Sequence, residues 1–425
     1  MATQRNALIT IITGQGGRAI LTFLRNWLLV RGLSPAEYGQ AATYSVIFSL
    51  VEMITQFSID RYLIISDEEE VQAALPNGHA LQFFRGVVVS LFLFACAPLI
   101  AAWFRYEDYS LAYGCMGLIF LLRSGVHFGI AIQQRKMNFI PTHGSYVLSE
   151  VFAICAILVG LWLHPSHYIL LIGLGVQSLT LLVASHCFSK EKYAFQFDKE
   201  LWRKIWNFSW PLLLNALMMY IGLHSDKFVI GRYYDKILFG EYFIVSSLFM
   251  IYTMQLRNIN DQFSLPIFSK AKNDPGHLAQ LFTKNFLRVA SLAFLGALVL
   301  SFFGHPLFSF VYQRAFDFSY GLFLPFSLWS FLRIIRSCTG AVALSLSQPH
   351  YILQANICRN CAMTLVILMI LKNISLEWVV FALCASECLA FSFTYVRLIK
   401  KCPLPRWILL IPPLICALFV AWHCV

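Results

Sequence analysis

The chain has 425 residues, of which 59% are hydrophobic and 12% are charged, and its formal net charge is +11 at pH 7. Its mean hydropathy is +0.67. Soluble domains carry about 25% charged residues, so this composition excludes an ordinary soluble protein. The basic residues fall in short stretches between long apolar runs, which indicates membrane topology rather than binding to a nucleic acid.

Apolar runs recur from one end of the chain to the other, and a run of roughly 20 apolar residues is the pattern of a transmembrane helix. We expect thirteen spans, and therefore an all-α polytopic membrane protein. Pro412 and Pro413 interrupt the last of them. In chain order the predicted spans are 7–30, 37–64, 80–104, 108–133, 143–164, 167–187, 207–233, 238–266, 279–303, 317–346, 350–371, 376–398 and 405–424.

The basic residues at the span ends predict the orientation. With a cytoplasmic N-terminus, fifteen Lys and Arg residues fall on the inner side and six on the outer side. Cytoplasmic loops carry the excess of basic residues in membrane proteins. We therefore expect the N-terminus to lie in the cytoplasm.

The two halves of the chain share residues at a constant offset of 201 positions, which predicts an internal repeat. The matched pairs are Arg31 with Arg232, Gly39 with Gly240, and Asp60 with Asp261. We expect a six-helix lobe over residues 1–187, a second over 207–399, and a tail over 400–425 that holds the thirteenth span. Both lobes begin on the cytoplasmic side, so the repeat is parallel, with a pseudo-two-fold axis along the membrane normal, as in several transporters.

Residues 188–206 form the longest connection between predicted spans. Trp202, Trp206 and Trp210 recur every four positions beside several basic residues. This pattern predicts an amphipathic helix in the cytoplasmic interface of the membrane, linking the two lobes.

Ten arginines lie within or at the edges of the apolar segments. A charge at the centre of a bilayer costs roughly 3 kcal/mol or more. Because the chain carries many such charges and most of them are positive, we expect them to line a hydrated cavity that holds an anionic molecule. The alternative is that single arginines extend to the interface or pair with a nearby acid. The ten are Arg18, Arg25, Arg61, Arg85, Arg123, Arg257, Arg288, Arg333, Arg336 and Arg359.

Arg18 and Arg25 are seven residues apart in the first span, so they share one face of a helix with Gln15 and Thr22. We expect this polar face to line the cavity. Arg18 lies near mid-membrane, where a side chain reaches the interface least well. The alternative is a seam between helices whose polar groups satisfy one another.

Four arginines of later spans are predicted to face the same cavity: Arg123, Arg257, Arg333 and Arg336. Arg257 precedes Asp261 by four residues, so a local salt bridge is the alternative there. Arg85, Arg288 and Arg359 lie near the predicted cytoplasmic ends of their spans, and we expect them to contact lipid headgroups.

Five acidic residues within spans are candidates for coupling to a proton or cation gradient, or for pairing with an arginine: Asp60, Glu150, Asp226, Asp261 and Glu387. Asp226 takes the repeat position of Arg25, so we expect opposite charges on the two lobes there, with a structural ion pair between the lobes as the alternative. No catalytic residue, metal or cofactor is expected, because the chain shows no metal-ligand cluster, nucleophile elbow or phosphate-binding loop.

Several short motifs resemble one family of membrane proteins. Residues 33–39 read Leu-Ser-Pro-Ala-Glu-Tyr-Gly, which is similar to the L-x-P-x-x-[FY]-G connection of the multidrug/oligosaccharidyl-lipid/polysaccharide (MOP) flippases. Residues 210–213 and 225–233 resemble that family's seventh helix, and residues 240–242 resemble the start of its eighth. The resemblance covers the whole chain in span order and is closest to the Wzx-type polysaccharide branch. The thirteenth span departs from the twelve or fourteen of the family.

The resemblance implies a V-shaped, two-lobed transporter of the bacterial inner membrane. It would move an undecaprenyl-diphosphate-linked oligosaccharide to the outer leaflet by alternating access, for O-antigen, exopolysaccharide or capsule biosynthesis. Arg18 and Arg25 are then the first candidates for contacts with the diphosphate. The implied partners are the lipid-linked substrate, membrane lipids, a polysaccharide polymerase and a chain-length regulator.

Two other functions are compared with this one. A multidrug cation antiporter of the same superfamily would favour acidic and aromatic cavity residues, and the excess of arginine argues against it. A membrane-embedded polysaccharide polymerase or ligase would carry a sizeable outer loop with reactive side chains. The longest predicted outer connection, near residues 304–316, has only about a dozen residues.

Overall fold

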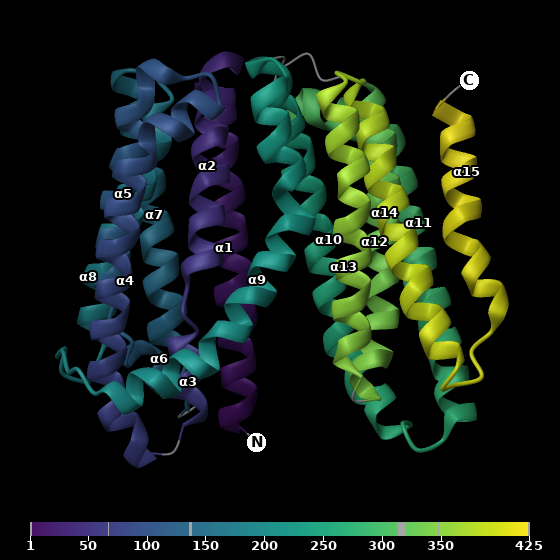
Figure 1. The fold of residues 1–425 in the computed structure, drawn as a ribbon, viewed down its shortest axis with the longest axis horizontal. Helices are drawn as coiled ribbons and strands as arrows, with labels where there is room; N and C mark the ends of the chain where they lie inside the picture. The colour runs from purple at the N-terminus through teal and green to yellow at the C-terminus, as the bar shows by residue number, and fades with distance from the viewer. Residues whose placement is uncertain (1, 67, 136–137, 313–319, 347, 424–425) are drawn as a thin grey trace. The chain divides into compact units, whose positions relative to one another are not determined.

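The computed structural model describes residues 2–66, 68–135, 138–312, 320–346 and 348–423, and in these ranges it contains helices and no strand. The chain folds as two compact units, Met1–Leu217 and Met218–Val425, here called the N-terminal and C-terminal units. Figure 1 shows the helices of each unit. The predicted all-α fold is confirmed. The lobe boundaries taken from the repeat stay a prediction.

The N-terminal unit is built from paired helices. The strongest packing joins α4 to α5, α7 to α8, and α1 to α7. Small residues allow close approach: a Cβ at Gly117 of α5 would lie 2.8 Å from the carbonyl oxygen of Ser90 on α4. The helices are α1 Ala2–Gly32, α2 Pro35–Thr55, α3 Ile59–Ile65, α4 Glu68–Trp103, η1 Glu107–Tyr109, α5 Ser110–Ser124, α6 Gly129–Arg135, α7 Ile140–Leu163 and α8 Tyr168–Phe188.

Two of the predicted spans are interrupted in this unit. The span predicted over 37–64 breaks at residues 56–58, between α2 and α3, and the span predicted over 108–133 breaks at residues 125–128, between α5 and α6. In the second break, side chains from other helices accept the hydrogen bonds of backbone N–H groups that are not bonded within a helix. The N–H of His127 donates to Ser185 at 2.9 Å, and the N–H of Phe128 donates to His79 at 3.2 Å.

The predicted linker is not a separate helix. Residues 189–198 lie outside helices, and α9 then runs without a break over Lys199–Tyr233, so the end of the linker and the seventh span form one helix. Asp198 starts it, because its carboxylate accepts the N–H of Glu200 at 2.8 Å.

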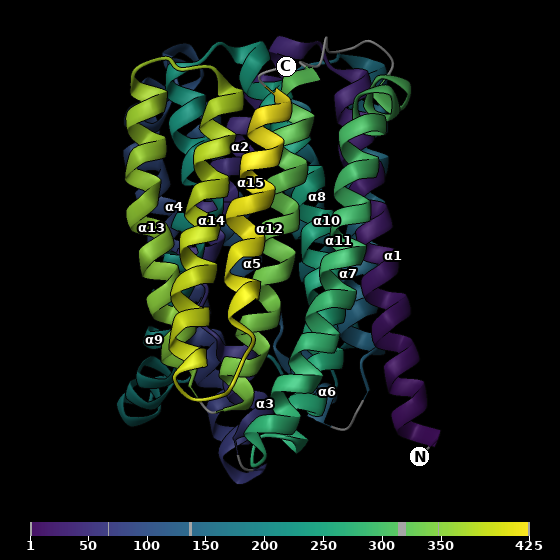
Figure 2. The same ribbon diagram turned by 90° about the vertical axis from the view of Figure 1, so that its right-hand side faces the viewer.

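The central helix of the C-terminal unit is α12, which packs against α10, α11, α14 and α15 (Figure 2). The span predicted over 317–346 corresponds to α12, and its residues 317–319 lie outside the described residues, as does residue 424 of the last span. The helices are α10 Lys236–Lys270, α11 Pro275–Tyr312, α12 Tyr320–Ser345, α13 Pro349–Leu371, α14 Leu376–Ile399, η2 Arg406–Leu410 and α15 Ile411–His423.

Seven of the described helices are long and apolar enough to cross a membrane, namely α4, α7, α8, α10, α11, α13 and α14, and the chain is a multi-pass membrane protein. This number is smaller than the thirteen predicted spans. The long helices α1, α9 and α12 are not among the seven, and these three carry many of the charged candidate residues. In α12, for example, Arg333 and Arg336 lower the mean hydropathy of the helix.

Candidate functional site

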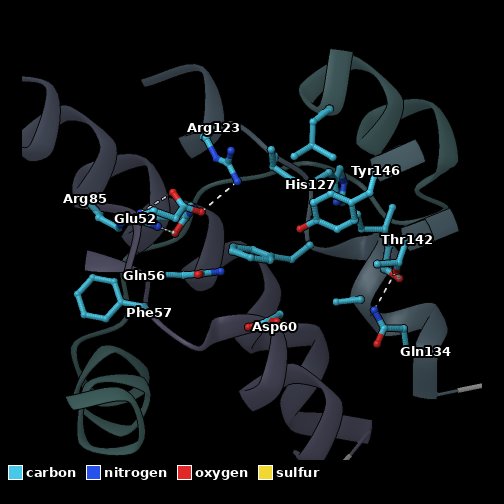
Figure 3. A pocket seen from close by; sticks show the side chains of 16 residues that line it. Glu52, Gln56, Phe57, Asp60, Arg85, Arg123, His127, Gln134, Thr142 and Tyr146 are labelled. Carbon is cyan, nitrogen blue, oxygen red and sulfur yellow. Dashed lines mark hydrogen bonds and ion pairs between the residues drawn. The ribbon is translucent and has the colours of Figure 1, made fainter. Parts of the chain in front are cut away.

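The N-terminal unit contains a pocket, here called the Glu52 pocket. Figure 3 shows its polar side chains, which come from α2 to α7 and from the two breaks that interrupt the predicted spans. Glu52, Gln56, Asp60, Gln82, Arg85, Arg123, His127, Gln134, Thr142 and Tyr146 are the polar members of the lining.

Glu52 is the centre of charge pairing in this pocket. Its carboxylate lies 3.0 Å from Arg123 Nη2 and 3.8 Å from Arg85 Nη2 (Figure 3). Two guanidinium groups therefore share one carboxylate, and with Asp60 in the same lining the two arginines and two acids balance in formal charge. Arg123 and Asp60 both line this pocket, and their roles in substrate binding and coupling stay predictions.

Arg85 was expected to contact lipid headgroups. It is instead buried, with 9% of its surface exposed. It donates hydrogen bonds to Thr55 at 3.2 Å and to Gln82 at 3.1 Å. The prediction was wrong because α4 begins at Glu68, twelve residues before the predicted span, so Arg85 lies in the middle of the helix.

Arg18 and Arg25 lie on α1 in different environments. Arg25 Nη1 is 3.1 Å from the Glu150 carboxylate on α7, which also accepts the Thr22 hydroxyl at 3.1 Å. Arg18 is exposed, and its guanidinium lies over the ring of Tyr146 at 4.4 Å from the centroid. Tyr146 lines the Glu52 pocket, so Arg18 lies beside that pocket with its charge not neutralised by any salt bridge among the described residues.

The C-terminal unit contains a buried group of charges, here called the Glu387 cluster: Arg333, Arg336, Arg359 and Glu387. The Glu387 carboxylate on α14 is 2.6 Å from Arg336 Nε and 3.4 Å from Arg359 Nη1. Arg333 lies with its guanidinium 4.7 Å from the Trp329 ring centroid. Two helices, α12 and α13, thus place three guanidinium groups around one carboxylate of α14.

Arg359 was likewise expected to contact lipid headgroups, and this expectation was wrong. Arg359 is 2% exposed and lies midway along α13 (Pro349–Leu371), too far from either end to reach an interface. The guanidinium lies directly against Gly222 of α9. Arg359 stands near the centre of the predicted span 350–371, and this position already indicated that it lies far from the membrane interface.

Arg257 and Asp261 form a salt bridge along α10, with 3.5 Å between Nε and Oδ2. This is the local pairing that the four-residue spacing allows. Together with Arg333, Arg336 and Ser337 these two residues line a small pocket, here called the Arg333 pocket. Next to it, the Asn260 amide donates to Ser337 at 2.8 Å.

Asp226 and Lys227 are both buried on α9. The Tyr242 hydroxyl donates to the Asp226 carboxylate at 2.5 Å, and Lys227 lies over the Phe243 ring at 5.6 Å. Arg25 and Asp226, predicted to carry opposite charges on the two lobes, thus each have a partner within their own unit. Lys227 was missed as a candidate, although the Ser-Asp-Lys motif contains it.

In the described part of the chain no three His, Cys, Asp or Glu side chains lie so that they could hold one metal ion. The Glu52 pocket offers amide and hydroxyl groups and aromatic faces, and the Arg333 pocket offers positive charge. These groups suit the binding of an anionic, hydroxyl-rich molecule.

Two curated proteins share sequence with parts of the chain. Succinoglycan biosynthesis transport protein ExoT of Rhizobium meliloti (strain 1021) is 25% identical over 218 residues, which is 50% of this chain and 43% of that protein. Teichuronic acid biosynthesis protein TuaB of Bacillus subtilis (strain 168) is 20% identical over 234 residues, which is 54% of this chain and 48% of that protein. The matches thus span about half of this chain and less than half of each relative.

Solved structures share the fold. Lipid II flippase MurJ in an inward closed conformation aligns with a TM-score of 0.67 and 13% identity, over 98% of both chains. An inward-facing multidrug resistance MATE family transporter of the MOP superfamily aligns with a TM-score of 0.66 and 13% identity, over 90% of this chain and 95% of that one. At such identities the likeness shows the fold alone, and the MOP-type fold predicted from the motifs is confirmed.

A family profile described as polysaccharide biosynthesis protein matches residues 28–319. This match covers more than half of the 425 residues. The chain therefore belongs to the polysaccharide biosynthesis protein family and has the fold of the MOP superfamily.

Proposed function

We propose that this protein is a flippase for a lipid-linked saccharide in polysaccharide biosynthesis. Its substrate would be an undecaprenyl-diphosphate-linked oligosaccharide that crosses the bacterial inner membrane by alternating access. The family assignment and the relative named as a transport protein support this role. The pathway served would be that of an O-antigen, an exopolysaccharide or a capsule.

The observation that carries the proposal is the position of Arg18. Its guanidinium is exposed, lies over Tyr146, and stands beside the Glu52 pocket. A diphosphate crossing a medium of low dielectric constant needs a cation that is free to receive it. The planar guanidinium can donate two hydrogen bonds to one phosphate group. Arg18 is therefore the proposed first contact of the diphosphate.

The Glu52 pocket is the proposed place for the sugar nearest to the diphosphate. Carboxylates, amides and hydroxyls, such as those of Asp60, Gln56 and Thr142, exchange hydrogen bonds with sugar hydroxyls. Phe57 and Tyr146 supply aromatic walls in the same lining. The polyprenyl chain needs no polar partner and stays in the lipid.

Arg25 and Glu150 are the proposed switch. An incoming diphosphate competes with Glu150 for Arg25, whose Nη1 lies 3.1 Å from the carboxylate. The released carboxylate then takes a proton or a cation, so the pair has a closed arrangement and a substrate-bound one. The remaining acids, Asp60, Asp226, Asp261 and Glu387, are secondary candidates for coupling.

The test is polysaccharide export in cells that carry Arg18→Ala. Loss of a charge-assisted contact corresponds to roughly a 10- to 100-fold reduction in export. Arg18→Lys should recover part of it, because the charge remains while the planar fork is lost. The matched control is Arg31→Ala, an exposed arginine of α1 that lies over Trp27 at 4.9 Å. Full export in Arg18→Ala at normal protein level contradicts the proposal.

A further inference from the structure

Arg333 of α12 is a buried arginine that no acid neutralises among the described residues. Its side chain is 3% exposed, and its Nε and Nη1 atoms have no hydrogen-bond partner in the described part of the chain. A buried guanidinium N–H without an acceptor costs free energy, and a buried charge without a counter-charge costs more. The Trp329 ring, 4.7 Å away, offsets only a small part of this cost.

The neighbours of Arg333 do not supply the missing negative charge. The Glu387 carboxylate is already held by Arg336 at 2.6 Å and by Arg359 at 3.4 Å. Three guanidinium groups against one carboxylate leave two positive charges in excess. The cluster lies in the interior of a helical bundle, where water screens these charges poorly.

The excess charge borders a space that can hold a ligand. Arg333 and Arg336 line the Arg333 pocket with Ser337 and Gly340. Asp261 also lines it, but Arg257 lies 3.5 Å from that carboxylate and offsets its charge. The lining of the pocket is therefore positive, and Arg333, whose Nε and Nη1 are unpartnered among the described residues, is one of its members.

We propose that the Arg333 pocket binds a small inorganic oxyanion, with phosphate as the representative ligand. Adjacent N–H groups of a guanidinium fit two oxygens of a tetrahedral oxyanion better than a spherical halide. A phosphate dianion matches the two excess charges. The bound anion is a resident part of the C-terminal unit that stabilises the Glu387 cluster, and it is distinct from the transported lipid.

The experiment measures thermal unfolding of the purified full-length protein in sodium gluconate, with sodium phosphate added up to a few millimolar. The wild type is expected to gain melting temperature with phosphate and to saturate. Arg333→Gln should raise the apparent Kd for phosphate by about tenfold or more, because a charge-assisted donor is lost. The apparent Kd of Arg333→Lys for phosphate should lie between those of the wild type and Arg333→Gln. Arg288→Gln, which removes an exposed arginine of α11, is the matched control and should behave as the wild type.

Each outcome decides the proposal. Saturable stabilisation that Arg333→Gln weakens and Arg288→Gln keeps supports it. A rise that does not saturate and is equal in all variants is the general salting effect of phosphate, and it overturns the proposal. If Arg333→Gln does not yield folded protein, Arg333→Lys and the wild type still give the comparison. A response to a soluble polyprenyl diphosphate but not to phosphate would assign the pocket to the transported lipid and also overturn the proposal.

Discussion

The guanidinium of Arg359 lies against the backbone of Gly222, so that a Cβ at this glycine would stand 2.7 Å from Arg359 Nε. Only a residue without a side chain lets α9 and α13 enclose that guanidinium. The contact also sets the direction in which Arg359 reaches Glu387, at 3.4 Å. The packing of one glycine and the geometry of the Glu387 cluster are therefore coupled.

Gly222→Ala is expected to destabilise the protein. The added methyl group forces Arg359 away from Glu387, and overpacking of this kind costs about 1–3 kcal/mol. Gly175→Ala is the control, because nothing lies within 4 Å of a Cβ at that position of α8. Thermal unfolding of both variants in one detergent measures the difference. Equal melting temperatures would show that Arg359 is free to move.

The Arg25–Glu150 pair allows a test of whether it serves structure or transport. Either single variant, Arg25→Ala or Glu150→Ala, leaves one buried charge unpaired and is expected to cost about 3–5 kcal/mol of stability. The exchange Arg25→Glu with Glu150→Arg should restore the melting temperature but not export, because the phosphate contact is then on the wrong helix. Restoration of both by the exchange would mean that the pair is purely structural.

His127 predicts a pH dependence of stability. Its Nδ1 accepts the N–H of Gly129 at 2.9 Å while its Nε2 lies 3.0 Å from the Glu191 carbonyl, so the folded state holds a neutral ring. Burial, followed by the neighbouring His186, lowers the pKa of His127. His79 and Tyr193 are the other titratable rings against it.

The sign follows from this lowered pKa. The unfolded chain takes up the proton near pH 6.5 and the folded one only at lower pH, so stability present above about pH 6.5 is lost as the pH falls. The melting temperature should therefore drop between pH 7.5 and 5.5, and His127→Gln should reduce this drop. His277→Gln, at an exposed site on α11, should leave it unchanged. An undiminished drop in His127→Gln would assign the effect to another group.

Cys388 of α14 and Cys416 of α15 have their sulfur atoms 3.3 Å apart. Copper phenanthroline is expected to join them, each thiol losing a proton and an electron to the oxidant. Both cysteines should then resist maleimide labelling, and Cys416→Ser should return Cys388 to the labelled state. Labelling of both residues after oxidation would contradict the docking of α15 against α14.

Features that depend on residues close in sequence could be predicted from the sequence. The salt bridge of Arg257 with Asp261 follows from a four-residue spacing, and the shared face of Thr22 and Arg25 follows from the helical period. The partners in the Glu387 cluster come from the three consecutive helices α12, α13 and α14, and no helical periodicity relates residues on different helices. The burial of Arg85 was missed for a different reason, because an error in where α4 begins moved the residue to the wrong depth.

The helix breaks escaped prediction because they are short and lie inside long predicted spans. Residues 56–58 are Gln-Phe-Ser, three residues within the predicted span 37–64. In the other break the bonds that replace the helical ones come from Ser185 and His79, which lie far from it in sequence. Such partners are visible only when the chain is folded.

These breaks have a consequence for how the protein can diverge. Gln56, Phe57, Val126 and Phe128 of the Glu52 pocket lie between helices rather than within them. A substitution of Gln56 or Val126 changes the wall of the pocket without altering a helix, whereas Phe57 and Phe128 also pack against a core cluster of several helices. Under the proposed function, related chains can acquire new sugar preferences by exchanging a few such residues, while their membrane-embedded framework is inherited unchanged.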